Sequence, residues 1–112
     1  MKSLYVASFD KSGGIYHYEI SGKEITQKQF VPLDRPMYFV TDGGKMYALL
    51  RDIGGESAVV SFDIDGEENL VNMSAPISTK GTIACHLAVD DGRICAAHYG
   101  SGSLFASPDV SL

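Results

Sequence analysis

Hydrophobic residues in this chain form short runs separated by glycine and aspartate. No window places apolar residues at i, i+3, i+4 and i+7 over two helical turns, whereas runs rich in Val, Ile, Tyr and Phe recur throughout. The pattern therefore predicts an all-β protein. Ten strands are expected, at 3–9, 14–20, 24–31, 37–41, 45–50, 58–64, 70–73, 86–89, 93–98 and 103–107.

These strands belong to a repeating unit. Residues 36–50 (PMYFVTDGGKMYALL) align with residues 84–98 (ACHLAVDDGRICAAH) at an offset of 48. This alignment matches Tyr38 with His86 and the turn at 42–44 with the turn at 90–92. A third, partial copy aligns residues 4–7 with 46–49 and 15–18 with 59–62. A repeat of this length, with four short strands, is typical of a β-propeller blade.

We therefore expect β-propeller blades of four antiparallel strands, with about two and a half blades present in a single partial propeller domain, 1–112. The strands of a blade are named A to D from the axis outward. Blade 1 is expected to hold strands B to D at 3–31, blade 2 all four strands at 36–74, and blade 3 strands A to C at 84–107.

Composition narrows the function classes. The chain has 14 acidic and nine basic residues and a net charge of -5. The basic residues are spread singly, with no stripe to neutralise phosphates, so nucleic-acid binding is disfavoured. The longest apolar run near the N-terminus, residues 4–9, is too short for a signal peptide or a membrane span. We expect a cytoplasmic protein with no membrane partner.

The two cysteines, Cys85 and Cys95, are expected to be free thiols. A hairpin turning at Asp91-Gly92 would place Cys85 opposite His98 and Cys95 opposite Ala88, which is outside bridging range. Their spacing fits neither a zinc knuckle nor a redox pair.

The stretch CHLAVDDGRICAAHYGSGSLF (85–105) resembles a segment of the lactonase family of seven-bladed β-propellers, which includes 6-phosphogluconolactonases and the fungal carboxymuconate lactonising enzymes. Residues 85–87 and 99–103 keep the family pattern. Asp90-Asp91-Gly92 replaces its Pro-Asp-Gly turn, and His98 stands where asparagine is usual. The N-terminal LYVASFDKSGGIYHYEI is similar to the family's opening strands.

The resemblance implies a hydrolase of carbohydrate metabolism, in the pentose phosphate pathway, that opens a sugar lactone without a metal or another cofactor. Such a reaction requires a base to activate water, donors for the oxyanion and cations to place the substrate's anion. The family's proposed site lies at the mouth of the central channel and includes a histidine at the start of this strand A. The resemblance therefore implies that His86 is catalytic. The alternative is a core histidine bonded to a backbone carbonyl.

Arg35 and Arg51 are candidates for binding the substrate's anion, with a surface role as the alternative for both. Arg93 follows a turn and is expected to be solvated. The other participants in the family's site lie on later blades and have no counterpart here. The resemblance implies seven blades where about two and a half are expected here, so we expect the chain to be the N-terminal third of a longer enzyme, and it is open whether the chain alone is active.

Other motifs have simpler interpretations. Residues 98–103 (HYGSGS) contain glycines but precede a strand rather than a helix, which indicates a turn rather than a phosphate loop. Residues 63–68 (DIDGEE) do not match a calcium loop and indicate a hairpin turn. His98 is not expected to be catalytic, and His17 is expected to be exposed.

Two functions remain open. The chain is a lactone hydrolase or part of one, or it is a non-catalytic propeller fragment or interaction module. Two and a half blades would leave apolar strands such as LYVASF and SLFAS uncovered, so we expect the isolated chain to self-associate through its blade faces or to be poorly stable.

Overall fold

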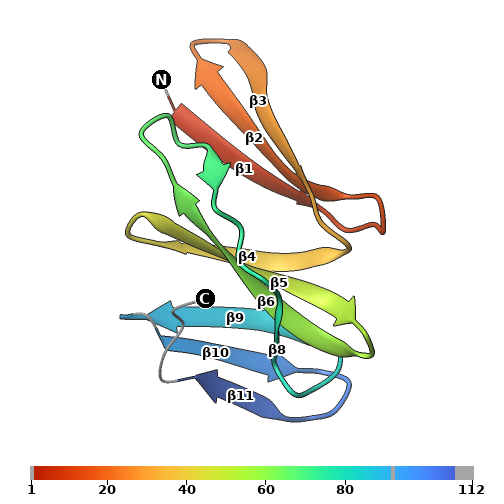
Figure 1. Cartoon of the computed structure of the whole chain (residues 1–112). Helices are drawn as coiled ribbons and strands as arrows, with labels where there is room; N and C mark the ends of the chain where they lie inside the picture. The colour runs from red at the N-terminus through yellow and green to blue at the C-terminus, as the bar shows by residue number, and fades with distance from the viewer. Residues whose placement is uncertain (1, 92, 108–112) are drawn as a thin grey trace.

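The computed structural model describes residues 2–91 and 93–107, which form eleven strands and no helix. The strands make three antiparallel sheets that follow one another along the chain, from the top to the bottom of Figure 1. The chain is therefore an all-β partial propeller, and we call the three sheets blades 1, 2 and 3. None of the described residues forms a helix long and apolar enough to cross a membrane.

Blade 1 is a three-stranded meander in the order β1-β2-β3. Its strands are β1 (Lys2–Ser8), β2 (Gly14–Ser21) and β3 (Glu24–Pro32). Gly14 has no room for a side chain, because a Cβ there would meet the carbonyl oxygen of Val31. Glycine at this position lets β2 and β3 approach closely at their paired ends.

Blade 2 has the full set of strands, in the order β4-β5-β6-β7. Its long strands are β4 (Pro36–Asp42), β5 (Lys45–Ile53) and β6 (Glu56–Ile64). The expected outermost strand 70–73 is split into β7 (Leu70–Val71) and β8 (Ile77–Ser78), and both pieces pair with β6. At the break, the backbone N–H of Ser61 donates to the hydroxyl of Ser74 at 2.9 Å, so a side chain replaces one bond of the ladder.

Blade 3 is formed by β9 (Ala84–Asp90), β10 (Arg93–His98) and β11 (Leu104–Ser107). The β9–β10 turn contains Asp91 at a positive φ of 50°, while Gly92 of the expected turn lies outside the described residues. Cys95 pairs with Ala88, as predicted, and both cysteines are free and exposed. The expected pairing of Cys85 with His98 is wrong, because a bulge pairs His98 with Ala84.

The burial pattern supports the repeat seen in the sequence. Alternate residues of each blade point toward the preceding blade, which we call the front face, or toward the following blade, the back face. Met46 and its repeat counterpart Ile94 are both buried on front faces, while Tyr47 is buried on the back face of blade 2. Aligned residues therefore have the same orientation in successive blades.

Two hydrophobic clusters hold the blades together. The cluster between blades 1 and 2 is centred on Ile15, Met46 and Phe62. The cluster between blades 2 and 3 is centred on Tyr47, Leu87 and Ile94. Burial of such side chains contributes about 1.5–3 kcal/mol each, so the inter-blade contacts dominate the stability of the fold.

The expectation that His17 is exposed is wrong. This side chain on β2 is only 1% exposed, on the back face of blade 1. Its Nδ1 lies 2.9 Å from Oδ1 of Asn69, its Nε2 lies 2.9 Å from Oγ of Ser3, and its ring stacks on Tyr5 at 5.0 Å between centroids. His17 therefore serves as a polar link from blade 1 to the β6–β7 turn of blade 2.

Candidate active site

The imidazole of His86 is exposed and lies against the ring of Tyr38. The two ring centroids are 4.9 Å apart, and Nε2 of His86 is 3.4 Å from the hydroxyl of Tyr38. The alternative of a core histidine bonded to a carbonyl does not apply, since His98 and not His86 has that environment. Within the described residues, Nδ1 of His86 makes no hydrogen bond.

Bulges at equivalent places orient these two side chains. The register of β4 with β5 shifts between Pro36 and Tyr38. The register of β9 with β10 shifts between Ala84 and His86. Each innermost strand therefore has an extra residue, Met37 or Cys85, just before the ring-bearing position. β-Bulges bend a strand and redirect the neighbouring side chains, and they are common beside active sites. Because β4 and β9 contact one another, the two redirected rings meet.

The two candidate arginines lie side by side at the same end of blade 2. Arg35 directly precedes β4 and has a positive φ of 48°, while Arg51 is near the end of β5. The backbone N–H of Arg51 donates to the carbonyl of Arg35 at 3.2 Å. The guanidinium of Arg51 lies over the ring of Phe9, 5.6 Å from its centroid. Within residues 2–91 and 93–107, neither arginine is hydrogen-bonded to His86.

A hollow connects Arg51 with the segment that leads into β9. Its volume is about 220 Å³, and it is lined by Arg51, Asp52, Gly55, Thr82 and Ile83. Ile83 is three residues before His86, so the hollow opens at the end of the blades at which β9 begins. Because it offers a cation, a carboxylate and a hydroxyl, it can take a ligand with both donors and acceptors.

Carboxylates surround the arginines. Nε of Arg35 donates to Oδ1 of Asp34 at 2.8 Å, and this hydrogen bond raises the pKa of Arg35 above its ordinary value. The negative charges of Asp34, Asp52 and Asp10 raise this pKa further, against a lowering by burial. Three carboxylates beside two guanidinium groups leave this end of the molecule without a strongly positive field.

His98 is a structural residue. It is buried, and both ring nitrogens have partners. Nδ1 donates to the carbonyl of Ser103 at 3.1 Å, and Nε2 lies 2.7 Å from the hydroxyl of Thr79. Gly81 packs against this ring so closely that a Cβ there would lie 2.7 Å from two ring carbons. The expectation that His98 is not catalytic fits this environment, since its ring is enclosed between blades 2 and 3.

The turn of residues 99–103 joins two strands, as the sequence predicts. Gly102 has a positive φ of 65°, and the backbone N–H of Gly100 donates to the carbonyl of Thr82 at 3.1 Å. The backbone N–H of Tyr99 likewise donates to the carbonyl of Ile83 at 2.8 Å, so these donors are used within the fold, which supports the interpretation as a turn.

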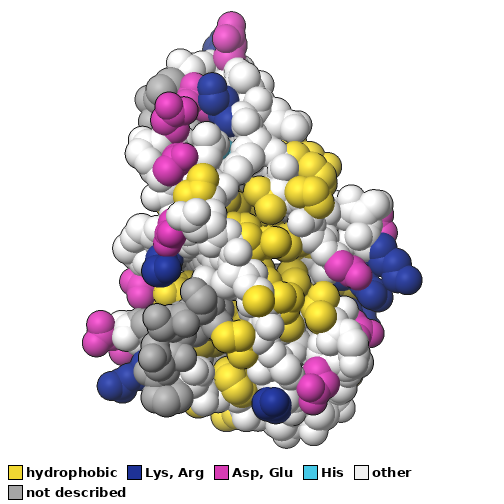
Figure 2. All heavy atoms as spheres, in the orientation of Figure 1, with side chains coloured by type: hydrophobic (Ala, Val, Ile, Leu, Met, Phe, Trp, Pro, Cys, Tyr) yellow, Lys and Arg dark blue, Asp and Glu magenta, His cyan; other side chains and the backbone are white. Residues whose placement is uncertain are grey.

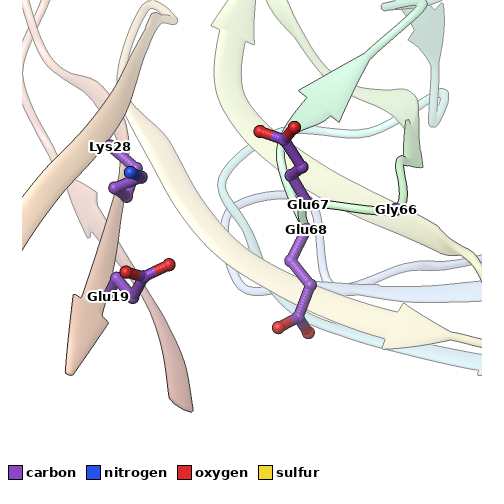
Figure 3. A pocket seen from close by; sticks show the side chains of 5 residues that line it. All are labelled: Glu19, Lys28, Gly66, Glu67 and Glu68. Carbon is purple, nitrogen blue, oxygen red and sulfur yellow. The ribbon is translucent and has the colours of Figure 1, made fainter. Parts of the chain in front are cut away.

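A second hollow, of about 390 Å³, lies between blade 1 and the β6–β7 turn. Figure 3 shows Glu19 and Lys28 on one side and residues 66–68 on the other, with the side chains of Glu67 and Glu68 pointing in opposite directions. The acidic groups do not converge on one point. Among the described residues, no group of His, Cys, Asp or Glu side chains has the arrangement needed to hold a metal ion.

Comparison with known proteins adds one decisive observation. A family model described as "Lactonase, 7-bladed beta-propeller" matches residues 3–108, which is nearly the whole chain. The chain belongs to the lactonase family. No curated protein and no solved structure matches this lactonase-family chain.

Family membership supports a lactone hydrolase-like function in general terms. Of the residues singled out from the sequence, the structure brings Arg35 and Arg51 together and leaves His86 accessible. The catalytic and binding roles of all three stay predictions. Tyr38 was missed as a site residue, although the alignment that places Tyr38 on His86 contained the signal.

Proposed function

We propose that this lactonase-family chain hydrolyses a sugar lactone of the 6-phosphogluconolactone type, with His86 as the general base. The observation that carries the proposal is the accessible His86 imidazole, whose Nε2 contacts Tyr38 while Nδ1 has no partner among the described residues. A base held by a neighbouring group on one side and open on the other is the usual arrangement for activating water.

In the proposed reaction, His86 takes a proton from a water molecule as that water attacks the lactone carbonyl carbon. The carbonyl oxygen becomes an oxyanion, which needs a hydrogen-bond donor, while Tyr38 holds the imidazole at Nε2. The bond from the carbonyl carbon to the ring oxygen then breaks. The ring oxygen takes the proton back from the imidazolium, and the product is the open hydroxy acid.

Arg35 and Arg51 would place the phosphate of the substrate, and the hollow beside Arg51 would take part of the sugar. The carboxylates around Arg35 weaken this attraction. Because exposed charge pairs contribute about 1 kcal/mol or less, we expect the phosphate to improve kcat/KM by no more than about tenfold over glucono-δ-lactone.

The test is hydrolysis above the spontaneous rate, followed by acid release at constant pH. The purified chain should hydrolyse 6-phosphogluconolactone, and His86→Ala should lower kcat/KM by about 10²-fold or more, the usual contribution of a general base. Lys23→Ala, in the exposed β2–β3 turn, is the control and should leave the rate unchanged. Equal rates for His86→Ala and the unaltered chain would overturn the assignment and favour the non-catalytic alternative.

A further inference from the structure

Ser3, His17 and Asn69 form a hydrogen-bonded series between blades 1 and 2. Nδ1 of His17 lies 2.9 Å from Oδ1 of Asn69, and Nε2 of His17 lies 2.9 Å from Oγ of Ser3. Because the amide oxygen only accepts, Nδ1 carries the ring proton and Nε2 presents its lone pair to the serine hydroxyl. A hydroxyl, an imidazole and a polar group that orients the ring are the three parts of a nucleophilic site.

The fold holds these three side chains in place from separate parts of the chain. Ser3 is on β1, His17 is on the paired strand β2, and Asn69 is in the β6–β7 turn of blade 2. The ring of His17 is 1% exposed and stacks on Tyr5, which fixes its orientation. The backbone N–H of Asn69 donates to Oδ1 of Asp65 at 2.9 Å, which fixes the turn. The series is therefore preorganised by the surrounding structure.

The hollow between blade 1 and the β6–β7 turn borders Ser3. Its volume is about 390 Å³, and its lining includes Glu19 and Glu68. Glu19 is paired with Ser3 across β1 and β2, and Oε1 of Glu68 accepts from the Ser3 hydroxyl at 2.9 Å. Ser3 itself is half-buried. Its hydroxyl is therefore beside a space that can hold a small ester.

Thr79 and His98 show the same kind of pair without this access. The hydroxyl of Thr79 is 2.7 Å from Nε2 of His98, but Thr79 is 1% exposed and also donates to the carbonyl of Ser57 at 3.1 Å. That pair is enclosed between blades 2 and 3 and serves packing. Ser3 differs because it is half-buried beside a hollow.

The charges around the hollow indicate the kind of ligand. The carboxylates of Glu19, Glu67 and Glu68 and the ammonium of Lys28 line it, so negative charge is in excess (Figure 3). Such a lining favours a positively charged ligand. A cation that pairs with Glu68 also occupies the carboxylate that accepts from Ser3, which leaves the hydroxyl proton to Nε2 of the imidazole.

We propose that Ser3, His17 and Asn69 form a second site, separate from His86, that hydrolyses esters carrying a cationic group. Oγ of Ser3 attacks the ester carbonyl carbon while its proton moves to Nε2 of His17, and Lys28 provides positive charge for the oxyanion. The bond from the carbonyl carbon to the leaving oxygen then breaks, and that oxygen takes the proton from the imidazolium. Water attacks the acyl-serine with His17 again as the base, which releases the acid and restores the hydroxyl.

The first test is covalent labelling of the full chain by a fluorophosphonate, in which the serine oxygen bonds to phosphorus and fluoride leaves. Mass spectrometry should locate the label on Ser3, and Ser3→Ala should abolish it. His17→Gln should slow labelling by about 10²-fold or more, the usual contribution of a general base. Ser21→Ala, at the exposed end of β2, is the control and should be labelled like the unaltered chain. An unlabelled Ser3 in the unaltered chain would overturn the proposal without any variant.

Substitutions of Asn69 separate a catalytic series from a merely structural one. Asn69→Asp keeps an acceptor for Nδ1–H and should label at least as fast as the unaltered chain. Asn69→Leu removes the acceptor that sets the tautomer and should label about tenfold more slowly or worse. Circular dichroism confirms that each variant is folded under the conditions compared. Equal labelling of the two variants would overturn the role of His17 as an oriented base.

The charge of the substrate is tested with acetylcholine and its neutral isostere, in which carbon replaces the nitrogen. We expect kcat/KM to be about fivefold higher for the cation, because exposed charge pairs contribute about 1 kcal/mol or less. Glu67→Gln should reduce this preference, and Glu24→Gln, exposed at the start of β3, should not. An equal rate for both esters would overturn the assigned substrate class. Since the label identifies Ser3, these results do not depend on lactone hydrolysis at His86.

Discussion

At the scale of single residues, Gly81 has the sharpest steric requirement. A Cβ at this position would lie 2.7 Å from Cδ2 and Cγ of the buried His98 ring, which Thr79 and Ser103 hold in place. Overpacking of this kind typically costs about 1–3 kcal/mol. We expect Gly81→Ala to lower the free energy of unfolding by that amount in urea denaturation. Gly44→Ala, where a Cβ meets nothing within 4 Å, is the control. Equal stability of the two variants would contradict the packing of His98.

Tyr5 provides a pH-dependent test of the contact between blades 1 and 2. Its hydroxyl donates to the carbonyl of Glu68 at 2.6 Å, and burial, followed by the charges of Glu68 and Asp65, raises its pKa above the ordinary 10.0. The unfolded chain therefore releases this proton at a lower pH than the folded chain. The stabilisation is complete below pH 10 and is lost as the pH rises through the folded-state pKa.

Tyr5→Phe should lower the free energy of unfolding by about 0.5–1.5 kcal/mol near neutral pH, the usual net value of a hydrogen bond. It should also reduce the fall of stability above about pH 10, because the titrating hydroxyl is gone. Tyr99→Phe, at a side chain that is 80% exposed, should change neither quantity. An unaltered alkaline slope in Tyr5→Phe would show that another group controls it.

The burial of His17 was not predictable from the local sequence pattern. His17 alternates with Tyr16 and Tyr18 on β2, and a polar residue between two aromatic residues reads as the solvent side of a strand. In the structure the tyrosines are on the uncovered front face, and His17 is on the buried back face with partners 14 and 52 residues away. Partners so distant in sequence cannot be inferred from local alternation.

At the scale of elements, the interruption of the outermost strand of blade 2 depends on Ser74. Its hydroxyl accepts from the N–H of Ser61, a residue that is 2% exposed. Ser74→Ala would leave this buried donor without a partner, which costs about 1–3 kcal/mol. Ser21→Ala, at the exposed end of β2, is the control in thermal and urea unfolding. If Ser74→Ala is as stable as the control, the break between β7 and β8 is not held to β6 by this hydrogen bond.

All ten expected strands have a counterpart among β1 to β11, since strand length, alternation and turn chemistry are local properties. The bulges at Met37 and Cys85 were not predictable in the same way, because a bulge depends on which residues of a neighbouring strand are paired. Those bulges orient Tyr38 and His86. The sequence therefore predicts that the candidate site lies on the innermost strand. It does not predict how the side chains of Tyr38 and His86 are oriented.

At the scale of the whole molecule, the three blades form a repeat in which equivalent residues have equivalent neighbours. This regularity explains why residues 38 and 86, which are aligned in the sequence, contact one another in the structure. In repeat architectures each unit packs on its neighbours, so aligned residues have equivalent surroundings.

The central claim is that successive blades bring the rings of Tyr38 and His86 together at their innermost strands. Nuclear Overhauser spectroscopy of the full chain with labelled histidine and tyrosine tests this contact directly, because the two centroids are 4.9 Å apart. The account predicts cross-peaks between the His86 and Tyr38 ring protons that disappear in Tyr38→Ala and persist in Tyr99→Phe. Cross-peaks from His86 only to residues of β9 and β10 would contradict the arrangement of the blades and remove the basis of the proposed site.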